Sequence, residues 1–330
     1  MTSHAPQSQS TPVCVIKTKG GMGNRMLCAA SGILWAKAVG RDPFVDWRDE
    51  AYSRNRENSF FHFFDNPAAL RDPPADEHEI VPPVWQGHLD KSVSEMLHTY
   101  DPDKHSSLTI HKKYSIDPTR ADYSQPTAVF WYYMGRFEAV ARLARKHLPG
   151  YADLSVEDIS RKALREELQL TQTLRAQIES FHAEHFPGPT VGVHVRYSDR
   201  TTDLGKLEAA ARAQLARLPG AAIFLATDNR RVEDDYRAKF DRVITTPKWF
   251  PPEGATMHQN TDCTDPIANG TEALLDMYLL ARCDALVYAS RSTFSEISRL
   301  VSDIPTDRVT DVDRRDPKML AKKLARRLTA

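Results

Sequence analysis

The strongest constraint on the fold is a regular alternation of two kinds of segment in the second half of the chain. Short apolar runs rich in β-branched residues predict strands at 190–195, 222–226, 242–245, 285–288 and 308–310. Apolar residues at helical spacing predict intervening helices at 206–218, 231–240, 271–283 and 293–301. Alternating strands and helices form a parallel sheet with helices on both faces. Ligands of such sheets bind at the carboxyl ends of the strands.

The first half of the chain begins with a strand, a glycine loop and a helix. Residues 13–16 are apolar, and 26–39 has helical spacing with Ala and Leu prominent. A strand at 43–47 would complete a βαβ unit. The loop between the first two elements supplies four candidate substrate-binding residues: Gly21, Gly23, Asn24 and Arg25.

The pattern between residues 48 and 126 is irregular. Pro, Asp and His are frequent there, so we expect long loops with short helices. Helical spacing returns at 137–148 and over the long run 155–186, which Pro187 ends.

The length of 330 residues is enough for two domains, each with its own core. We expect a disordered tail at 1–12, rich in Ser, Gln and Pro, and two α/β lobes of the Rossmann-like kind. The N-terminal lobe would cover 13–186. The C-terminal lobe would cover 187–330 and end in a basic helix at 317–328.

Composition argues against several classes of partner. The 44 basic residues balance 44 acidic ones, so no net field draws the chain to nucleic acid. No window approaches the roughly 20 apolar residues of a membrane-spanning helix, and the tail lacks the apolar core of a signal peptide. We expect a cytoplasmic protein. Peripheral contact of the basic helix with the inner face of the membrane stays open, as does the oligomeric state.

Cysteines and paired acids give little indication of a metal site. Cys14, Cys28, Cys263 and Cys283 are scattered without C-x-x-C spacing, which predicts buried free thiols. Two acidic pairs could hold a divalent cation or lie on solvated surface: Asp101 with Asp103, and Asp311 with Asp313. We expect no metal.

His194 and Arg196 are candidates because they lie at the carboxyl end of a predicted strand. Their spacing of two puts both side chains on one face of that strand. A guanidinium can make paired hydrogen bonds to phosphate oxygens. A structural ion pair with a nearby acid is the alternative that the spacing leaves open.

Two further candidate groups follow neighbouring predicted strands. Asp228 and Asn229 follow the strand at 222–226, where Asp228 could contact ribose or base, or cap the next helix. Ser290, Ser292 and Thr293 open the helix at 293–301, where free backbone N–H groups and the helix dipole favour an anion. Ordinary helix capping is the alternative for this cluster.

The glycine loop is also compatible with a dinucleotide-binding role. Gly21 and Gly23 match the start of the fingerprint, and Asp46 ends the next strand, where a ribose ligand is expected. Met26 replaces the third glycine, however. An NAD-dependent oxidoreductase therefore remains a rival, whereas the absence of a G-x-x-x-x-G-K-[ST] sequence argues against a P-loop enzyme.

Six segments together, in this order, resemble the α1,6-fucosyltransferase family, most closely the bacterial nodulation (NodZ-like) fucosyltransferases, which decorate chitin-like oligosaccharides. They are 21–23, 45–48, 192–196, 224–228, 247–250 and 273–283. The resemblance implies two Rossmann-like lobes of the glycosyltransferase B type (GT-B). It also implies an inverting transfer of L-fucose from GDP-fucose to a glycan hydroxyl, with no cofactor or metal.

The resemblance assigns roles to matching residues. Arg196 would hold the β-phosphate of GDP, His194 and Asp276 would lie near the guanine, and Asp228 near the nucleotide. Ser292 and Thr293 would contact phosphate. The C-terminal lobe would bind the donor, and the glycine loop would face it from the acceptor side, the N-terminal lobe.

One stretch departs from the nodulation enzymes. Residues 197–200, which follow Arg196, are closer to the animal core fucosyltransferases. The glutamate proposed as the base in those enzymes aligns with Leu204, next to Asp203. Asp199 and Asp203 are therefore the candidates for the catalytic base here.

Other functions remain compatible with the same scaffold. Another GDP-sugar or protein O-fucosylation would use the same cleft, and a catalytically silent nucleotide-sugar binding protein would keep it without turnover. The acceptor is not identified by the sequence. The aromatic residues Trp85, Trp131, Tyr132 and Tyr133 could stack on sugar rings or belong to the core.

Overall fold

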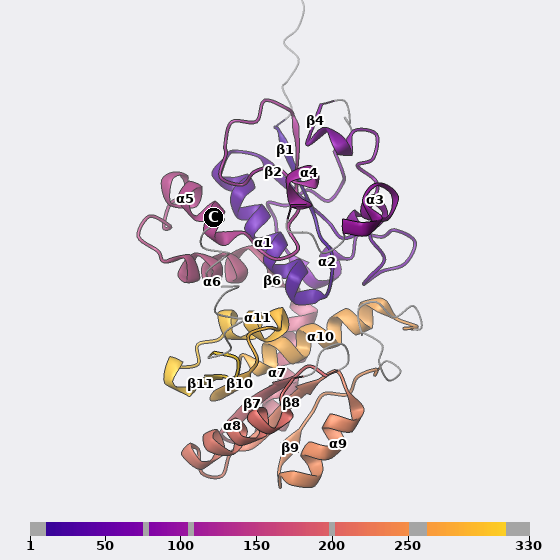
Figure 1. The fold of residues 1–330 in the computed structure, drawn as a ribbon. Coiled ribbons are helices and arrows are strands. Elements are labelled where there is room, and N and C mark those ends of the chain that lie inside the picture. Colours follow the sequence, from indigo (N-terminus) through magenta and orange to yellow (C-terminus); the bar gives the residue numbers. More distant parts are fainter. Residues whose placement is uncertain (1–10, 75–78, 105–108, 198–201, 251–262, 315–330) are drawn as a thin grey trace, which may run out of the picture.

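The computed structural model describes residues 11–74, 79–104, 109–197, 202–250 and 263–314. They form two lobes, each built on a parallel sheet, with one lobe above the other in Figure 1. The predicted tail and the predicted basic helix at 317–328 lie largely or wholly outside the described residues. Among the helices described, none is long and apolar enough to cross a membrane.

The N-terminal sheet has four parallel strands in the order β2-β1-β5-β4. The strands are β1 (Val13–Lys17), β2 (Asp42–Asp46), β4 (Ile80–Val81) and β5 (Thr127–Phe130). With α1 (Met22–Ala38), β1 and β2 form the predicted βαβ unit, although the helix begins four residues earlier than the expected 26–39. The sequence pattern did not indicate β5, a central strand that pairs with β1.

Short elements and loops fill the predicted irregular region, as expected. They are α2 (Phe60–Phe63), β3 (Phe64–Asp65), η1 (Pro83–Trp85), α3 (Val93–Tyr100), η2 (Pro102–Lys104) and α4 (His111–Tyr114). The N-terminal lobe is completed by α5 (Phe137–His147) and α6 (Val156–Glu167), which pack against α1.

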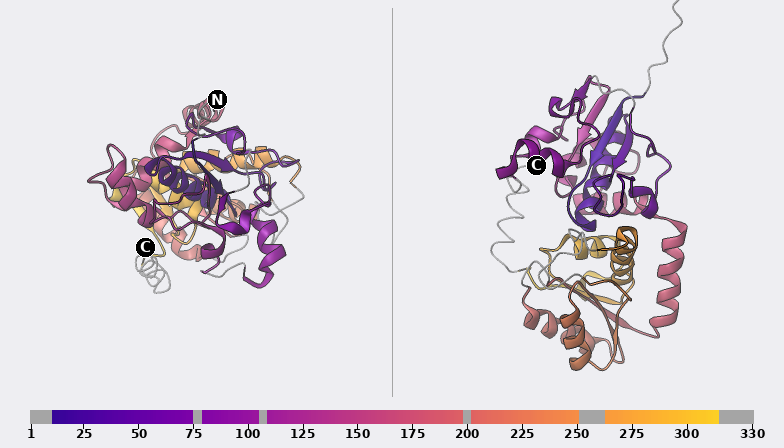
Figure 2. Two further views of the ribbon diagram at one scale, coloured as in Figure 1. Left: turned by 90° about the horizontal axis from the view of Figure 1, so that it is seen from above. Right: turned by 90° about the vertical axis from the view of Figure 1, so that its right-hand side faces the viewer.

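The run 155–186, predicted as one helix, is interrupted in the structure. A short strand, β6 (Gln169–Leu170), separates α6 from α7 (Gln172–His185) and pairs antiparallel with β3 through Leu170 and Phe64. Both of these side chains are buried, so burial against a distant segment overrides the local helical pattern. The right-hand view of Figure 2 shows α7 running from the upper lobe down one side of the lower lobe. The predicted lobe boundary after residue 186 stays a prediction.

The C-terminal sheet confirms the predicted alternation, with five parallel strands in the order β11-β10-β7-β8-β9. The strands are β7 (Thr190–Val195), β8 (Ala222–Thr227), β9 (Val243–Ile244), β10 (Ala285–Tyr288) and β11 (Val309–Asp311). The helices are α8 (Leu204–Arg217), α9 (Arg230–Lys239), α10 (Pro266–Leu280) and α11 (Thr293–Val301), with η4 (Thr306–Arg308) before β11.

One hydrophobic core extends through both lobes. It contains β1, α1 and β5 of the first lobe together with α10, α11 and one face of the second sheet, while a smaller core covers that sheet's other face. The helix α11 packs against both α1 and α6, as its position between the lobes in Figure 1 suggests. The carboxyl ends of β1 and β10 therefore lead to segments that meet between the sheets.

Candidate active site between the two sheets

The glycine loop meets the start of α11 at the boundary of the lobes. Gly20 has a φ of +90°, a left-handed conformation that favours glycine. Gly21 is the N-cap residue of α1, and Gly23 lies so close to the backbone of Thr293 that no Cβ would fit. The N-termini of α1 and α11 thus face the same region, and Asn24 lies beside Gly20. Two helix N-termini at one place favour a bound anion.

Arg25 holds the glycine loop in place. Its side chain is 1% exposed, and its Nε donates to the carbonyl of Gly20 at 2.7 Å. One Nη donates to Thr18 Oγ1 at 3.1 Å and the other pairs with Asp49 at 2.5 Å. The residue that the sequence proposes as a substrate contact therefore shapes the loop. Direct contact of Arg25 with substrate stays a prediction.

Tyr52 is a buried residue beside the start of α1. The backbone N–H of Met22 donates to the Tyr52 hydroxyl, and the ring lies under the guanidinium of Arg25 at 5.4 Å. Burial raises the pKa of Tyr52, while the nearby Arg25 and Arg196 oppose the rise. Arg196 of the second lobe is thus near enough for its charge to act on the Tyr52 phenol. Sequence reasoning gave Tyr52 no role, because no local pattern marks it.

His194 is buried at the end of β7. Its ring stacks on Phe294 of α11, with the centroids 4.7 Å apart and the planes 10° from parallel. Burial, followed by the charges of Arg196 and Lys248, lowers the pKa of His194 to about 3. The imidazole is therefore neutral near pH 7. Among the described residues, nothing hydrogen-bonds its buried Nδ1.

The segment after β7 is tied to the next strand. Arg196 is half-buried, and its carbonyl accepts a hydrogen bond from the Thr202 hydroxyl at 2.8 Å. The N–H of Tyr197 donates to Asp228 Oδ1 at 2.8 Å. Asp228 thus holds the backbone beside Arg196. Helix capping of α9, the alternative weighed for Asp228, is done by Asn229, whose side chain accepts from the N–H of Val232 at 3.2 Å.

The start of α11 carries two buried hydroxyl groups. Ser292 is the N-cap residue, yet its side chain makes no capping hydrogen bond. Within the described part of the chain, Ser290 Oγ and Ser292 Oγ are buried without a hydrogen-bond partner. Ordinary capping therefore does not explain these serines. Hydroxyls and free N–H groups at a helix N-terminus suit a phosphate group.

The second acidic pair orders the turn that contains these serines. Asp311 accepts from the N–H of Ser290 at 3.1 Å. Asp313 forms a bidentate ion pair with the guanidinium of Arg291, at 2.7 and 2.8 Å. In the first lobe, Asp101 likewise accepts from the Tyr114 hydroxyl at 2.7 Å. Asp101, Asp311 and Asp313 thus have hydrogen-bond partners within the protein. The described residues contain no group of three or more His, Cys, Asp or Glu residues that could hold a metal ion.

Asp276 of α10 has two protein partners. Its Oδ1 accepts from the hydroxyl of Thr246 at 2.6 Å, and its Oδ2 forms a buried ion pair with Lys248. On the same helix, Glu272 accepts the N–H of Trp249 at 3.1 Å, and burial raises its pKa. Lys248 places a cation close enough to His194 to affect its pKa. The segment 247–250 carried part of the family resemblance, but the sequence did not indicate this ion pair.

Of the two candidate bases, Asp203 lies within the described residues. Asp203 is exposed and caps α8, where it accepts from the N–H of Lys206 at 3.1 Å. That hydrogen bond lowers the pKa of Asp203. Asp199 lies outside the described residues. The role of either residue as the base stays a prediction.

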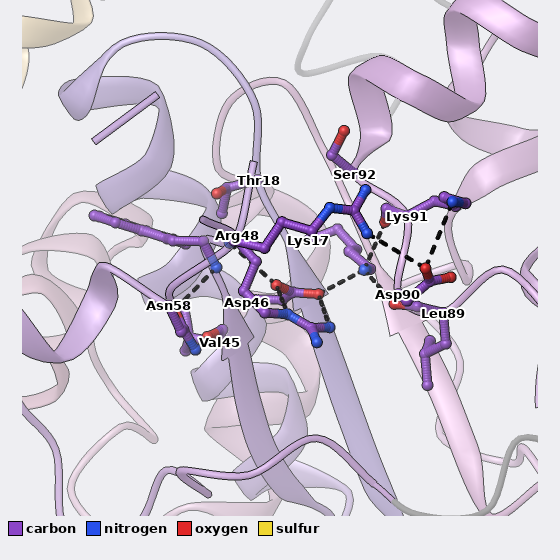
Figure 3. Close-up of polar contacts among 12 residues, drawn as sticks. Lys17, Thr18, Val45, Asp46, Arg48, Asn58, Leu89, Asp90, Lys91 and Ser92 are labelled. Atoms are coloured by element: carbon purple, nitrogen blue, oxygen red, sulfur yellow. Dashed lines mark hydrogen bonds and ion pairs between the residues drawn. The ribbon is translucent and has the colours of Figure 1, made fainter. Parts of the chain in front are cut away.

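Asp46, the residue on which the NAD alternative depends, is already engaged by cations. Figure 3 shows its carboxylate between Lys17 Nζ, at 2.5 Å, and the guanidinium of Arg48, at 2.8 Å. Lys17 also donates to the carbonyls of Leu89 and Lys91 at 2.6 and 2.8 Å. Asp46 is 5% exposed and ties β2 to Lys17 of β1, which in turn binds the loop before α3. Its oxygens thus serve this buried network, which disfavours a ribose contact.

The cysteines match the prediction. Cys14, Cys28, Cys263 and Cys283 are free and buried. Burial raises the pKa of the Cys28 thiol to about 12, so this group is not a thiolate near neutral pH. None of the four belongs to the candidate site described above.

Two curated relatives resemble part of the chain. Nodulation protein Z of Bradyrhizobium diazoefficiens is 30% identical over 162 residues, which is 44% of this chain and 42% of that protein. Nodulation protein Z of Sinorhizobium fredii is 29% identical over 164 residues, 44% of this chain and 49% of that protein. The chain therefore aligns with about half the length of these relatives.

Solved structures share the fold over most of the chain. The NodZ alpha-1,6-fucosyltransferase co-crystallized with GDP has a TM-score of 0.61 and 23% identity, covering 89% of this chain and 93% of the other. A mutant of Arabidopsis thaliana FUT1 in complex with GDP has a TM-score of 0.51 and 16% identity, covering 92% and 73%. The two Rossmann-like lobes are of the GT-B type, as expected. The model of the family Nodulation protein Z (NodZ) matches residues 154–327, more than half of the 330 residues, and the chain belongs to that family.

Proposed function

We propose that this protein transfers L-fucose from GDP-fucose to a sugar hydroxyl of a glycan acceptor, in an α1,6-type linkage with inversion at C1. The observation that carries the proposal is the meeting of the N-termini of α1 and α11 at Gly23 and Thr293, where the buried hydroxyls of two serines have no described partner. Arg196, whose charge acts on Tyr52 beside the start of α1, would add the cation. A diphosphate needs this combination of guanidinium, N–H and hydroxyl donors. A solved structure of the same fold is described as NodZ alpha-1,6-fucosyltransferase soaked with GDP-fucose.

In the proposed reaction, the bond between fucose C1 and a β-phosphate oxygen breaks while an acceptor hydroxyl attacks C1 from the opposite face. The electron pair of the broken bond leaves with GDP. Negative charge therefore grows on the diphosphate, where Arg196 stabilises it. The hydroxyls of Ser290 and Ser292, with the backbone at Thr293, add donors that are already oriented.

The remaining site residues would bind the nucleotide. His194, with its neutral imidazole, and Asp276 would lie near the guanine, with Asp228 and Asn229 beside the nucleotide. Asp276 would reach the base while it keeps its ion pair with Lys248. Gly21, Gly23, Asn24 and Arg25 would line the cleft from the acceptor side.

The acceptor hydroxyl must lose its proton, and Asp199 or Asp203 would take it. A dissociative path needs little base assistance, because most of the bond cleavage precedes attack. No metal is required in this proposal, since the charge on the leaving group is met by Arg196 and helix N–H groups. The glycan would approach from the N-terminal lobe.

A thermal-shift comparison of GDP with NAD separates this proposal from an oxidoreductase. A ligand at about 100 times its dissociation constant stabilises the native state by about 2.7 kcal/mol. We expect GDP to raise the melting temperature and NAD to leave it unchanged. Stabilisation by NAD alone would contradict the proposal.

Turnover is tested by GDP release from GDP-fucose with a panel of chitooligosaccharide, lipopolysaccharide-type and peptide acceptors. Release that depends on a glycan supports the proposal, and release with peptides indicates protein O-fucosylation. GDP-mannose in place of GDP-fucose tests for another donor sugar. If the protein binds GDP-fucose but neither transfers the fucose nor slowly hydrolyses the donor, it is a silent binding protein instead.

A further inference from the structure

Tyr133 is an exposed aromatic residue beside the glycine loop. Only three large hydrophobic side chains are exposed in the described part of the chain: Tyr100, Tyr133 and Tyr197, at 46%, 40% and 38%. Tyr133 follows β5, the neighbour of β1, and so lies at the same edge of the sheet as the glycine loop. A Cβ atom built at Gly20 would stand 3.4 Å from its hydroxyl oxygen. Tyr133 therefore lies beside the glycine loop in the first lobe.

The residues just before Tyr133 are firmly held. Trp131 is 1% exposed, and its N–H donates to Ser115 Oγ at 3.0 Å. The hydroxyl of Tyr132 donates to the carbonyl of Ile116 at 3.0 Å. The two aromatic residues that precede Tyr133 thus belong to the lobe's own structure.

The residues just after Tyr133 are held against α1. Gly135 lies so close that an added Cβ would be 2.7 Å from the carbonyl oxygen of Leu27. The N–H of Arg136 donates to Ser31 Oγ at 3.3 Å. Because both flanks are anchored, the loop presents Tyr133 with little flexibility to lose on binding.

We infer that Tyr133 stacks against a sugar ring of the acceptor, an inference that rests on the proposed fucosyl transfer. A tyrosine ring offers an apolar face for the C–H face of a pyranose, while its hydroxyl stays in water. Apart from the N-terminus of α1, the groups proposed to bind GDP belong to the second lobe, whereas Tyr133 belongs to the first and is not among them. Tyr133 is thus a specificity residue for the glycan and not for the nucleotide.

The test compares Tyr133→Ala, Tyr133→Phe and Tyr100→Ala with the wild type, using the panel acceptor that gives the fastest GDP release. Tyr100 is a matched control, an exposed tyrosine at the end of α3. We expect Tyr133→Ala to raise the acceptor KM about tenfold, the effect of one lost aromatic contact. Tyr133→Phe should keep most of the affinity, and Tyr100→Ala all of it. GDP affinity and acceptor-free hydrolysis of GDP-fucose should be the same in all variants.

Two results would overturn the inference in different ways. If the wild type transfers fucose but Tyr133→Ala has an unchanged acceptor KM, the role of Tyr133 alone is refuted. The same holds if Tyr133→Ala loses as much affinity for GDP as for the acceptor. A wild type that neither transfers fucose nor hydrolyses GDP-fucose would refute the proposed function, and the role of Tyr133 with it. Melting temperatures close to that of the wild type identify the variants as folded.

Discussion

Gly23 of α1 lies directly against Thr293 of α11, so that a Cβ atom at Gly23 would stand 2.6 Å from both the carbonyl carbon and the carbonyl oxygen of Thr293. The contact joins the helix that follows β1 to the helix that follows β10. The absence of a side chain at Gly23 thus sets the distance between the two proposed anion-binding helix ends.

Gly23→Ala should weaken both the fold and the proposed transfer. Because the clash is with backbone, the helices must separate, and overpacking of this kind costs about 1–3 kcal/mol. Urea unfolding measures the loss, and GDP release measures the activity. Gly188→Ala is the control, since nothing lies within 4 Å of the added Cβ. Equal stability and activity in the two variants would contradict the tight contact.

Arg196→Ala should abolish most of the transfer without unfolding the protein. Removing one preorganised donor to developing charge typically lowers the rate by about 10²–10³. Arg196 is only half-buried, so we expect a melting temperature close to that of the wild type. Arg217→Ala, which removes an exposed arginine at the end of α8, serves as the control. Near-normal turnover in Arg196→Ala would refute the role.

His194 should make the stability of the protein depend on pH in mildly acidic solution. Its pKa falls from the ordinary 6.5 to about 3 in the folded protein, so between these values only the unfolded chain binds the proton. Stability attributable to His194 is therefore present above pH 6.5 and is lost as the pH falls, by about 1.4 kcal/mol per unit. Urea unfolding of wild type and His194→Gln from pH 7 to pH 5 measures this difference. Parallel curves would show that the imidazole is not held neutral.

Lys248→Met should destabilise the protein by leaving Asp276 buried without its cation. Breaking a buried ion pair from one side costs about 3–5 kcal/mol. The double variant Lys248→Met with Asp276→Leu removes both charges and should recover part of that loss. The free energies of unfolding of Lys248→Met, Asp276→Leu and the double variant, each compared with the wild type, form a double-mutant cycle. Additive losses would show that the two side chains do not interact.

The sequence alone determined the architecture of the second lobe. The predicted strands at 190–195 and 285–288 and the helix at 293–301 match β7, β10 and α11. Central strands of a parallel sheet are buried on both faces, so they read as continuous apolar runs that are visible without tertiary information. The positions of Arg196 and the serines at strand ends follow from the same pattern.

The sequence could not determine elements that depend on distant partners. β5 has only four residues, and its place beside β1 depends on pairing with a segment over 100 residues away. The division of the run 155–186 likewise depends on the pairing of Leu170 with Phe64. Short strands gain their stability from neighbours rather than from local propensity.

Only the tertiary structure decided what the candidate side chains contact. The aromatic residues considered as sugar platforms looked equivalent in sequence, yet Trp85 and Trp131 are buried and Tyr133 is exposed. Asp46, a possible ribose ligand by position, is held by Lys17 and Arg48. Residue type and spacing show what chemistry a side chain can perform. Its burial and partners come from segments far along the chain, and these decide whether the side chain is available for that chemistry.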